Sequence, residues 1–230
     1  GLIWYLVREN RREGYPMVSD RGVIGGWLPK PSPKTYLLAN GGTMQAPAED
    51  SGEEQPINAE RLAGNDGSAY EPVGNPLTAG VGPGSWSARP DHADLDHEGH
   101  PKIRPLSLLP ECGVSDRDPD PRGKALIDGH GEEAGTVVDL WLDVPEMNFR
   151  YLEAEVTGET GPVRVLVPMT FARVRRDGTV HVHALLAHQF AGIPRLRSPG
   201  QVSLLEEEKI TAYCGAGLLY ASPERVQPLI

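Results

Sequence analysis

Histidines and carboxylates that could exchange protons or bind a metal are concentrated in one short segment. The stretch Asp91-His92-Ala93-Asp94-Leu95-Asp96-His97-Glu98-Gly99-His100 interleaves the two residue types. Its spacing matches no strict zinc motif, because further ligands would have to come from elsewhere in the chain. We therefore predict no metal site, and Asp96, Glu98 and His100 are the candidates if one exists. The alternative is a solvated acidic loop.

A second group of ionisable residues lies at a turn. Asp143-Val144-Pro145-Glu146 carries two carboxylates, and Arg150 follows four residues after Glu146. Judged from the residues alone, an exposed Glu146 paired with Arg150 would account for this pattern. Such a surface pair contributes little to stability and carries no chemistry by itself.

The residues from 107 to 197 are predicted to form a mainly β domain that positions this turn. Alternating apolar and polar residues, together with short apolar runs, indicate strands at Gly135–Asp143, Phe149–Val156, Val163–Val167 and Thr179–His183. Asp177-Gly178 is a hairpin signal before the last of them. Short strands at this spacing favour a small antiparallel barrel. His181 and His183 share one face of their strand, and we interpret them as structural or surface residues.

The C-terminal segment, 198–230, is predicted to contain a helix. Ser203-Leu204-Leu205-Glu206 forms a capping box, in which the serine and glutamate side chains satisfy free backbone N–H groups. We expect the helix to run to about Ala216 and to end near Gly217. We interpret its acidic start as a cap and not as a functional site.

The first residues, 1–13, are typical of a helix that leaves a membrane. Gly1–Val7 carries no charge, and it is too short to span a bilayer, which requires about 20 apolar residues. We expect it to be the last turns of a transmembrane helix that begins before Gly1; the alternative is a short buried helix. Aromatic and basic residues suited to the membrane interface are Trp4, Tyr5, Arg8, Arg11 and Arg12.

Composition limits the remaining possibilities. The net charge of −10 argues against a nucleic-acid partner, because phosphates would be repelled. Two cysteines far apart in the sequence give no disulfide framework.

The segment 14–106 is rich in proline, glycine and acidic residues, with one possible strand at Thr35–Ala39 and an acidic loop at Ala48–Gln55. We expect it to be extended and to pack on partner proteins.

Several segments, in order along nearly the whole chain, carry a family resemblance. They are Arg11–Pro16, Pro31–Tyr36, Pro72–Leu77, Val81–Pro83, Asp120–Gly123, Val138–Asp143, Phe190–Pro194 and Glu206–Tyr220. In these segments the chain resembles the H subunit of the purple bacterial photosynthetic reaction centre. The resemblance implies one N-terminal transmembrane helix and a PRC-barrel domain on the cytoplasmic side of the bacterial inner, intracytoplasmic photosynthetic membrane.

The resemblance also implies partners and cofactors. The chain would be a non-enzymatic accessory subunit that binds no cofactor alone and covers the L and M subunits. Core antenna subunits, lipid and a cytochrome subunit would be further neighbours. Bacteriochlorophyll, bacteriopheophytin, quinones and a non-haem iron would lie on the partner subunits.

Proton delivery to the secondary quinone is the remaining implied role. In the family a glutamate after Asp-x-Pro lies close to that quinone, and an arginine follows it; Glu146 and Arg150 match these positions. The family's surface uptake point has Asp, His and His at alternate positions, which correspond to Asp96, Glu98 and His100. Glu98 replaces the middle histidine, so a specific imidazole role there is in doubt. Asp143 and Lys102 complete the candidate set.

Two other classes of function fit part of the sequence. PRC-barrels also occur in soluble proteins, including an RNA-processing factor type, so the chain could be a binding module without a membrane partner. The acidic charge and the junction of Gly1–Val7 with arginines count against that. A metal hydrolase using the His92–His100 cluster lacks a defined nucleophile or ligand triad.

Overall fold

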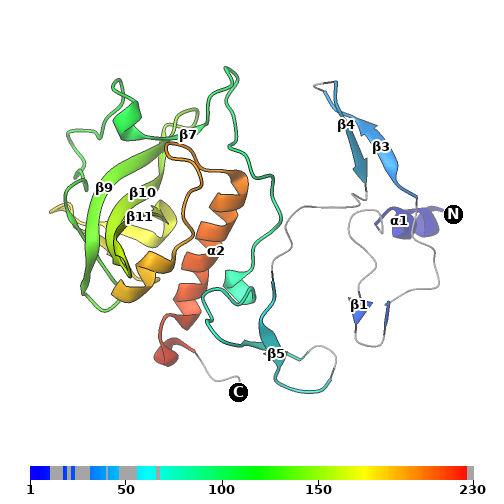
Figure 1. Cartoon of the computed structure of the whole chain (residues 1–230). Coiled ribbons are helices and arrows are strands. Elements are labelled where there is room, and N and C mark those ends of the chain that lie inside the picture. Colours follow the sequence, from blue (N-terminus) through cyan, green and yellow to red (C-terminus); the bar gives the residue numbers. More distant parts are fainter. Residues whose placement is uncertain are drawn as a thin grey trace. The chain divides into compact units, whose positions relative to one another are not determined.

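The chain divides into two compact units. The computed structural model describes residues 1–10, 18–19, 22–23, 32–39, 41–46, 56–65 and 68–226 (Figure 1). One unit comprises residues 1–52 and 61–69, and the other comprises residues 53–60 and 70–230. Residues 70–106, which the sequence placed with the extended segment, therefore group with the β domain.

The first unit consists of one short helix and two small hairpins. Its elements are α1 (Leu2–Asn10), β1 (Val18–Ser19), β2 (Gly22–Val23), β3 (Lys34–Leu37) and β4 (Thr43–Ala46). β1 pairs with β2 and β3 with β4, both antiparallel. β3 confirms the strand expected near Thr35. Arg11, Arg12 and the loop Ala48–Gln55 lie outside the described residues.

Helix α1 confirms that Gly1–Val7 is largely helical. Leu2 and Ile3 of this helix are 72% and 79% exposed. The Arg8 guanidinium lies 5.6 Å from the centre of the Trp4 ring, a cation–π contact. Within the described ranges, no helix has the length and apolar character needed to cross a bilayer.

The second unit is built on a seven-stranded sheet. Its strands are β7 (Ile103–Pro105), β8 (Ala125–Ile127), β9 (Glu133–Asp143), β10 (Asn148–Gly158), β11 (Gly161–Pro168), β12 (Ala172–Val174) and β13 (Val180–Val182). The order is β11-β10-β9-β8-β13-β12, and β7 also pairs with β9. Only the β8–β13 pair, among these, is parallel.

Short elements complete the described structure. They are the two-stranded sheet of β5 (Ala59–Arg61) and β6 (Tyr70–Pro72) and the 3₁₀ turns η1 (Gly82–Gly84), η2 (Leu106–Leu108), η3 (Met169–Phe171), η4 (Ala187–Gly192) and η5 (Pro223–Arg225).

The mainly β prediction is confirmed, but the sheet is open. Among the described strands, the hydrogen-bonded path ends at β11 and β12 and does not close on itself. The turn η3 separates these two strands in sequence, and β11 contains Pro162 and Pro168. Proline lacks the N–H of a ladder hydrogen bond, so it is tolerated on an edge strand.

Strand β10 shows the predicted alternation with one exception. Leu152, Ala154 and Val156 are buried, whereas Glu155 is exposed. Tyr151 should share the outer face with Glu155, yet only 3% of it is exposed. The cause is helix α2 (Leu204–Tyr220), whose first turn covers Tyr151, as described below.

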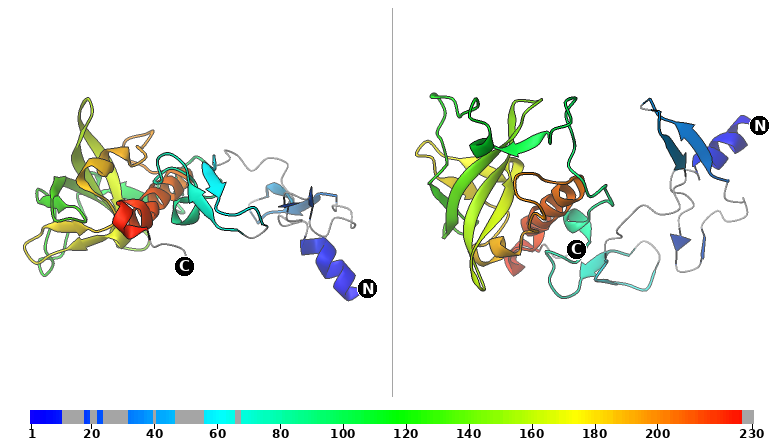
Figure 2. Two further views of the ribbon diagram at one scale, coloured as in Figure 1. Left: turned by 90° about the horizontal axis from the view of Figure 1, so that it is seen from below. Right: turned by 45° about the horizontal axis from the view of Figure 1, so that its top comes forward.

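Helix α2 begins as predicted and ends later than predicted. The Ser203 hydroxyl accepts the Glu206 N–H, and the Glu206 side chain accepts the Ser203 N–H, which completes the capping box. The expected end near Gly217 is wrong, because the helix continues to Tyr220. Gly217 is instead a packing position: a Cβ there would lie 2.3 Å from the Ala184 carbonyl oxygen. Figures 1 and 2 show α2 in orange to red beside the sheet.

Gly217→Ala is therefore expected to destabilise the chain by about 1–2 kcal/mol. Overpacking typically costs about 1–3 kcal/mol, and the better helix propensity of alanine offsets about 1 kcal/mol of that. Urea unfolding of the full chain would measure the difference. Leu218→Ala, on the exposed side of the same helix, is the control and should change stability by less than about 0.5 kcal/mol. An unchanged midpoint for Gly217→Ala would contradict the close packing.

Candidate functional site

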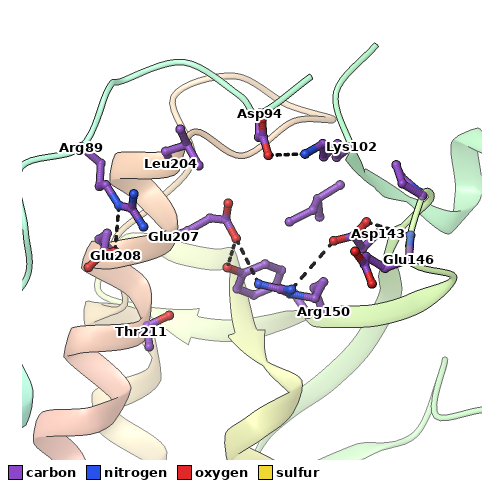
Figure 3. Close-up of a pocket in the computed structure, with 13 residues that line it drawn as sticks. Arg89, Asp94, Lys102, Asp143, Glu146, Arg150, Leu204, Glu207, Glu208 and Thr211 are labelled. Carbon is purple, nitrogen blue, oxygen red and sulfur yellow. Dashed lines mark hydrogen bonds and ion pairs between the residues drawn. The ribbon is translucent and has the colours of Figure 1, made fainter. Parts of the chain in front are cut away.

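An ionisable cleft lies where the β9–β10 turn, β7 and the start of α2 meet. It encloses about 350 Å³ (Figure 3). Most of its lining side chains are charged. They are Arg89, Asp94, Lys102, Ile103, Asp143, Pro145, Glu146, Arg150, Tyr151, Leu204, Glu207, Glu208 and Thr211.

Asp143 fixes the turn that presents Glu146. It is the last residue of β9 and is only 6% exposed. One of its carboxylate oxygens, Oδ1, accepts the Glu146 N–H at 3.3 Å. Met147 has φ 50°, a conformation that few side chains adopt, so the chain turns sharply here. Glu146 itself is exposed, and Figure 3 shows it next to Asp143 at one side of the cleft.

Arg150 lies between two carboxylates. Its Nη1 is 3.8 Å from Asp143 Oδ2, and its Nη2 is 3.9 Å from Glu207 Oε2. In the described part of the chain these ion pairs replace the Glu146–Arg150 pair that the sequence alone suggested. Among the described residues Glu146 forms no ion pair within 4 Å, and its electrostatic partner in the cleft is Lys102, whose pKa it raises.

Glu207 is the most buried of the cleft carboxylates that the sequence analysis did not assign to the site. Only 17% of its side chain is exposed, and the Tyr151 hydroxyl donates to its Oε2 at 2.8 Å. Burial raises the pKa of Glu207, and Asp143 raises it further, whereas Tyr151 and Arg150 act in the opposite direction. Burial, followed by Glu207, also raises the pKa of Tyr151. Glu207 can thus hold a proton in a pH range where exposed glutamates do not.

The neighbouring acidic residues explain why Glu207 was overlooked. Glu206 caps the helix, and Glu208 accepts from Arg89 at 3.2 Å. All three acids satisfy the same sequence signature of a helix N-terminus. Only the contact with Tyr151, which is 56 residues away in sequence, separates Glu207 from the others.

Glu207→Gln is expected to stabilise the chain at pH 8 and to leave it unchanged near pH 4. With a raised folded-state pKa, the stability linked to protonated Glu207 is fully present below the ordinary value of 4.5 and is lost as pH rises through the raised value. Glutamine mimics the protonated form at every pH. Thermal melts at both pH values would measure this, with Glu206→Gln as the control. A lower melting temperature for Glu207→Gln at pH 8 would contradict the buried-charge interpretation.

The loop from Asp94 to Lys102 connects the cleft to the surface. The Asp96 N–H donates to the His100 carbonyl oxygen at 2.8 Å, and the Lys102 N–H donates to the Asp94 carbonyl oxygen at 2.9 Å. At the base, Lys102 Nζ donates to Asp94 Oδ2 at 2.7 Å, and this bond raises the pKa of Lys102. The base of the loop therefore lines the cleft. At the tip Glu98 and His100 are exposed, whereas only 9% of the Asp96 side chain is exposed.

The tip brings Asp96, Glu98 and His100 together as their alternate spacing suggested. One potential ligand atom from each lies within 4.8 Å of the others. His100 Nδ1 is 3.8 Å from Asp96 Oδ2 and 3.6 Å from Glu98 Oε2. The N–H groups of His100 and Glu98 donate to Asp96 Oδ1, and they lower its pKa. These three side chains are close enough to share one proton or one cation.

Family comparisons cover most of the chain. Residues 1–108 match the family described as photosynthetic reaction centre, H-chain N-terminal region. Residues 114–185 match the PRC-barrel domain. The two matches follow one another in the order that the sequence resemblance requires.

The chain belongs to the reaction-centre H-subunit family. The predicted resemblance is thus confirmed, and the H chain is a structural subunit of a photosynthetic complex and not an enzyme. The PRC-barrel match on its own would also fit a free-standing module. The match over residues 1–108 is what places this H subunit with reaction centres and their membrane.

The candidate residues of the H subunit fall into two groups in space. Asp143, Glu146, Arg150 and Lys102 line the cleft together. Asp96, Glu98 and His100 form the loop tip and do not line it. Residues that sequence reasoning did not assign to the site also line the cleft: Arg89, Asp94, Tyr151, Glu207, Glu208 and Thr211.

Proposed function

We propose that this H subunit caps the cytoplasmic side of the L and M subunits and passes protons toward the secondary quinone. The observation that carries the proposal is the ionisable cleft, in which half-buried Glu207 shares Arg150 with Asp143 beside exposed Glu146. Reduction of a quinone consumes protons in a site shielded from water. Carboxylates with raised pKa values are suited to hold and release those protons.

The proposed proton path begins at the loop tip. Asp96, Glu98 and His100 collect protons from solvent: imidazole is the side-chain type that exchanges protons near neutral pH, and the Asp96 carboxylate, whose pKa is lowered by the N–H groups that it accepts, stays charged and attracts them. The Asp94–Lys102 pair at the loop base lines the same cleft as Glu207 and Asp143. Water in the cleft would bridge these groups, and the protons leave at the turn through Glu146. Arg150 keeps Asp143 and Glu207 from repelling one another as they titrate.

Exposed apolar side chains of the first unit support the proposed contact with partner subunits. Tyr36, Leu37, Leu38 and Met44, on and beside the β3–β4 hairpin, are 43%, 86%, 41% and 52% exposed. Gathered apolar side chains of this kind mark interaction sites on proteins. We assign this hairpin to the L and M interface. Helix α1 would contact the membrane interface through Trp4, Tyr5 and Arg8. Lipid, antenna subunits and a cytochrome subunit would be further neighbours. All pigments, quinones and iron would be bound by partner chains.

Reconstitution tests the proposal. Pigmented L–M complex stripped of its H subunit should regain fast proton-coupled quinone reduction when the full chain is added back. Amide exchange of residues 32–39 and 41–46 should slow in the complex, while exchange of β9 and β10 stays the same. A chain that neither binds the stripped complex nor changes its quinone reduction would favour the alternative, a PRC-barrel module that acts without a membrane partner.

A further inference from the structure

A second hollow, separate from the ionisable cleft, is lined by basic side chains. It encloses about 520 Å³ between strands β12 and β13 and the turn that follows β8. Its basic lining residues are His130, Arg173, Arg175, His181 and His183. The proposed proton path uses none of them.

The strand pairing explains why these side chains converge. Arg173 on β12 lies directly opposite His181 on β13. Val180 and Val182 are fully buried, so the alternation of a β-strand turns His181 and His183 outward together. The same alternation puts Arg175 on the face of Arg173. The parallel pairing of β13 with β8 then brings the turn containing His130 beside them.

The carboxylate that lines this hollow is held by backbone donors. Asp128 is the only acid in its lining, and both oxygens of its carboxylate are engaged. Oδ1 accepts the N–H groups of His130 and Glu132 at 2.8 Å each, and Oδ2 accepts that of Ala187 at 2.9 Å. Burial alone would raise the pKa of Asp128, but these donors bring it below its ordinary value. The Asp128 carboxylate therefore stays charged, and its hydrogen bonds go to the backbone.

Two further acids act on the histidines from outside the lining. Asp177, in the turn before β13, interacts electrostatically with His181, and Glu224, in η5, interacts with His130. Asp177 is itself held by the N–H and hydroxyl of Thr179. Within the described residues, no ion pair engages Arg173 or Arg175. The lining itself thus carries two arginine charges against the single carboxylate of Asp128, in a chain whose net charge is −10.

We infer that this hollow binds a phosphate-bearing anion. The two arginine forks match the planar, bidentate geometry with which guanidinium groups recognise phosphate. The Thr170 side chain, also in the lining, adds a hydroxyl donor. The ring nitrogens of the three histidines in the lining add further potential hydrogen-bond donors. The ligand is either a free phosphate compound or the headgroup of an anionic phospholipid.

Isothermal titration of the full chain with inorganic pyrophosphate tests the inference. We expect saturable binding to one site. The variant Arg173→Gln/Arg175→Gln should bind about 100-fold more weakly, since each charge-assisted pair contributes about tenfold. Arg176→Gln removes the same charge next to Arg175 but outside the hollow, so it should keep binding within about twofold.

A parallel measurement identifies the source of the phosphate. Flotation with vesicles of phosphatidylglycerol in phosphatidylcholine should show binding that the double variant loses and that Arg176→Gln keeps, if the ligand is a headgroup. Binding of pyrophosphate without vesicle binding assigns a free phosphate compound. Absence of both, or equal losses in Arg176→Gln and the double variant, would overturn the inference.

Discussion

Glu146→Gln is expected to slow the second, proton-coupled electron transfer to the secondary quinone by at least about tenfold, as loss of a positioned proton carrier typically costs that much or more. The first electron transfer should change little. Glutamine keeps the size of the side chain and most of its hydrogen bonding, and the Asp143 contact that shapes the turn uses the backbone N–H of residue 146, which the substitution retains. Only the titrating group is lost.

Flash-induced electron-transfer rates and proton uptake on the assembled complex would measure this effect. Glu155→Gln is a matched control, because Glu155 is exposed on β10 and pairs with Arg164 at 3.8 Å, outside the cleft. The control should leave both electron transfers unchanged. If Glu146→Gln behaves like the control, Glu146 carries no protons, and the chain is a structural cap only.

The β domain could be predicted because its signals are local. The alternation in β10 and the Asp177-Gly178 turn each depend on neighbouring residues, and the structure contains the strands they indicate. The end of α2 could not be predicted in this way. Gly217 is a frequent stop signal for helices, but here its missing side chain admits the Ala184 carbonyl, a contact made by a distant segment.

The candidate site likewise contains residues that the sequence identified and residues that it did not. Asp96, Glu98 and His100 were selected because the family resemblance places ionisable residues at these alternate positions, and residues two apart in a tight loop stay close together. Glu207 was not found, since its environment comes from Tyr151 and Arg150 on another element. The ion-pair partner that the sequence suggested for Arg150 was wrong for the same reason. Glu146 is close to Arg150 in sequence, whereas in the fold Arg150 contacts the more buried carboxylates of Asp143 and Glu207.

The double variant Asp96→Asn/His100→Gln is expected to slow proton uptake by more than the product of its two single effects. Each single change should cost less than about threefold, and the double change about tenfold or more, because alternative routes compensate for one loss but not for two. Asp96→Asn keeps an oxygen that can accept the N–H groups of Glu98 and His100, so the loop should hold its shape. Glu98 remains as the last acceptor at the tip.

Proton uptake measured with a pH indicator after a light flash would decide this, at low and high ionic strength. Glu155→Gln/His188→Gln removes one carboxylate and one imidazole that are both exposed and lie outside the cleft and the loop tip, and it should leave uptake unchanged. Strictly multiplicative single effects would mean that Asp96 and His100 act at independent points. A double variant with normal uptake would mean that protons enter elsewhere, and Glu146 and Glu207 would then be supplied directly from the open side of the cleft.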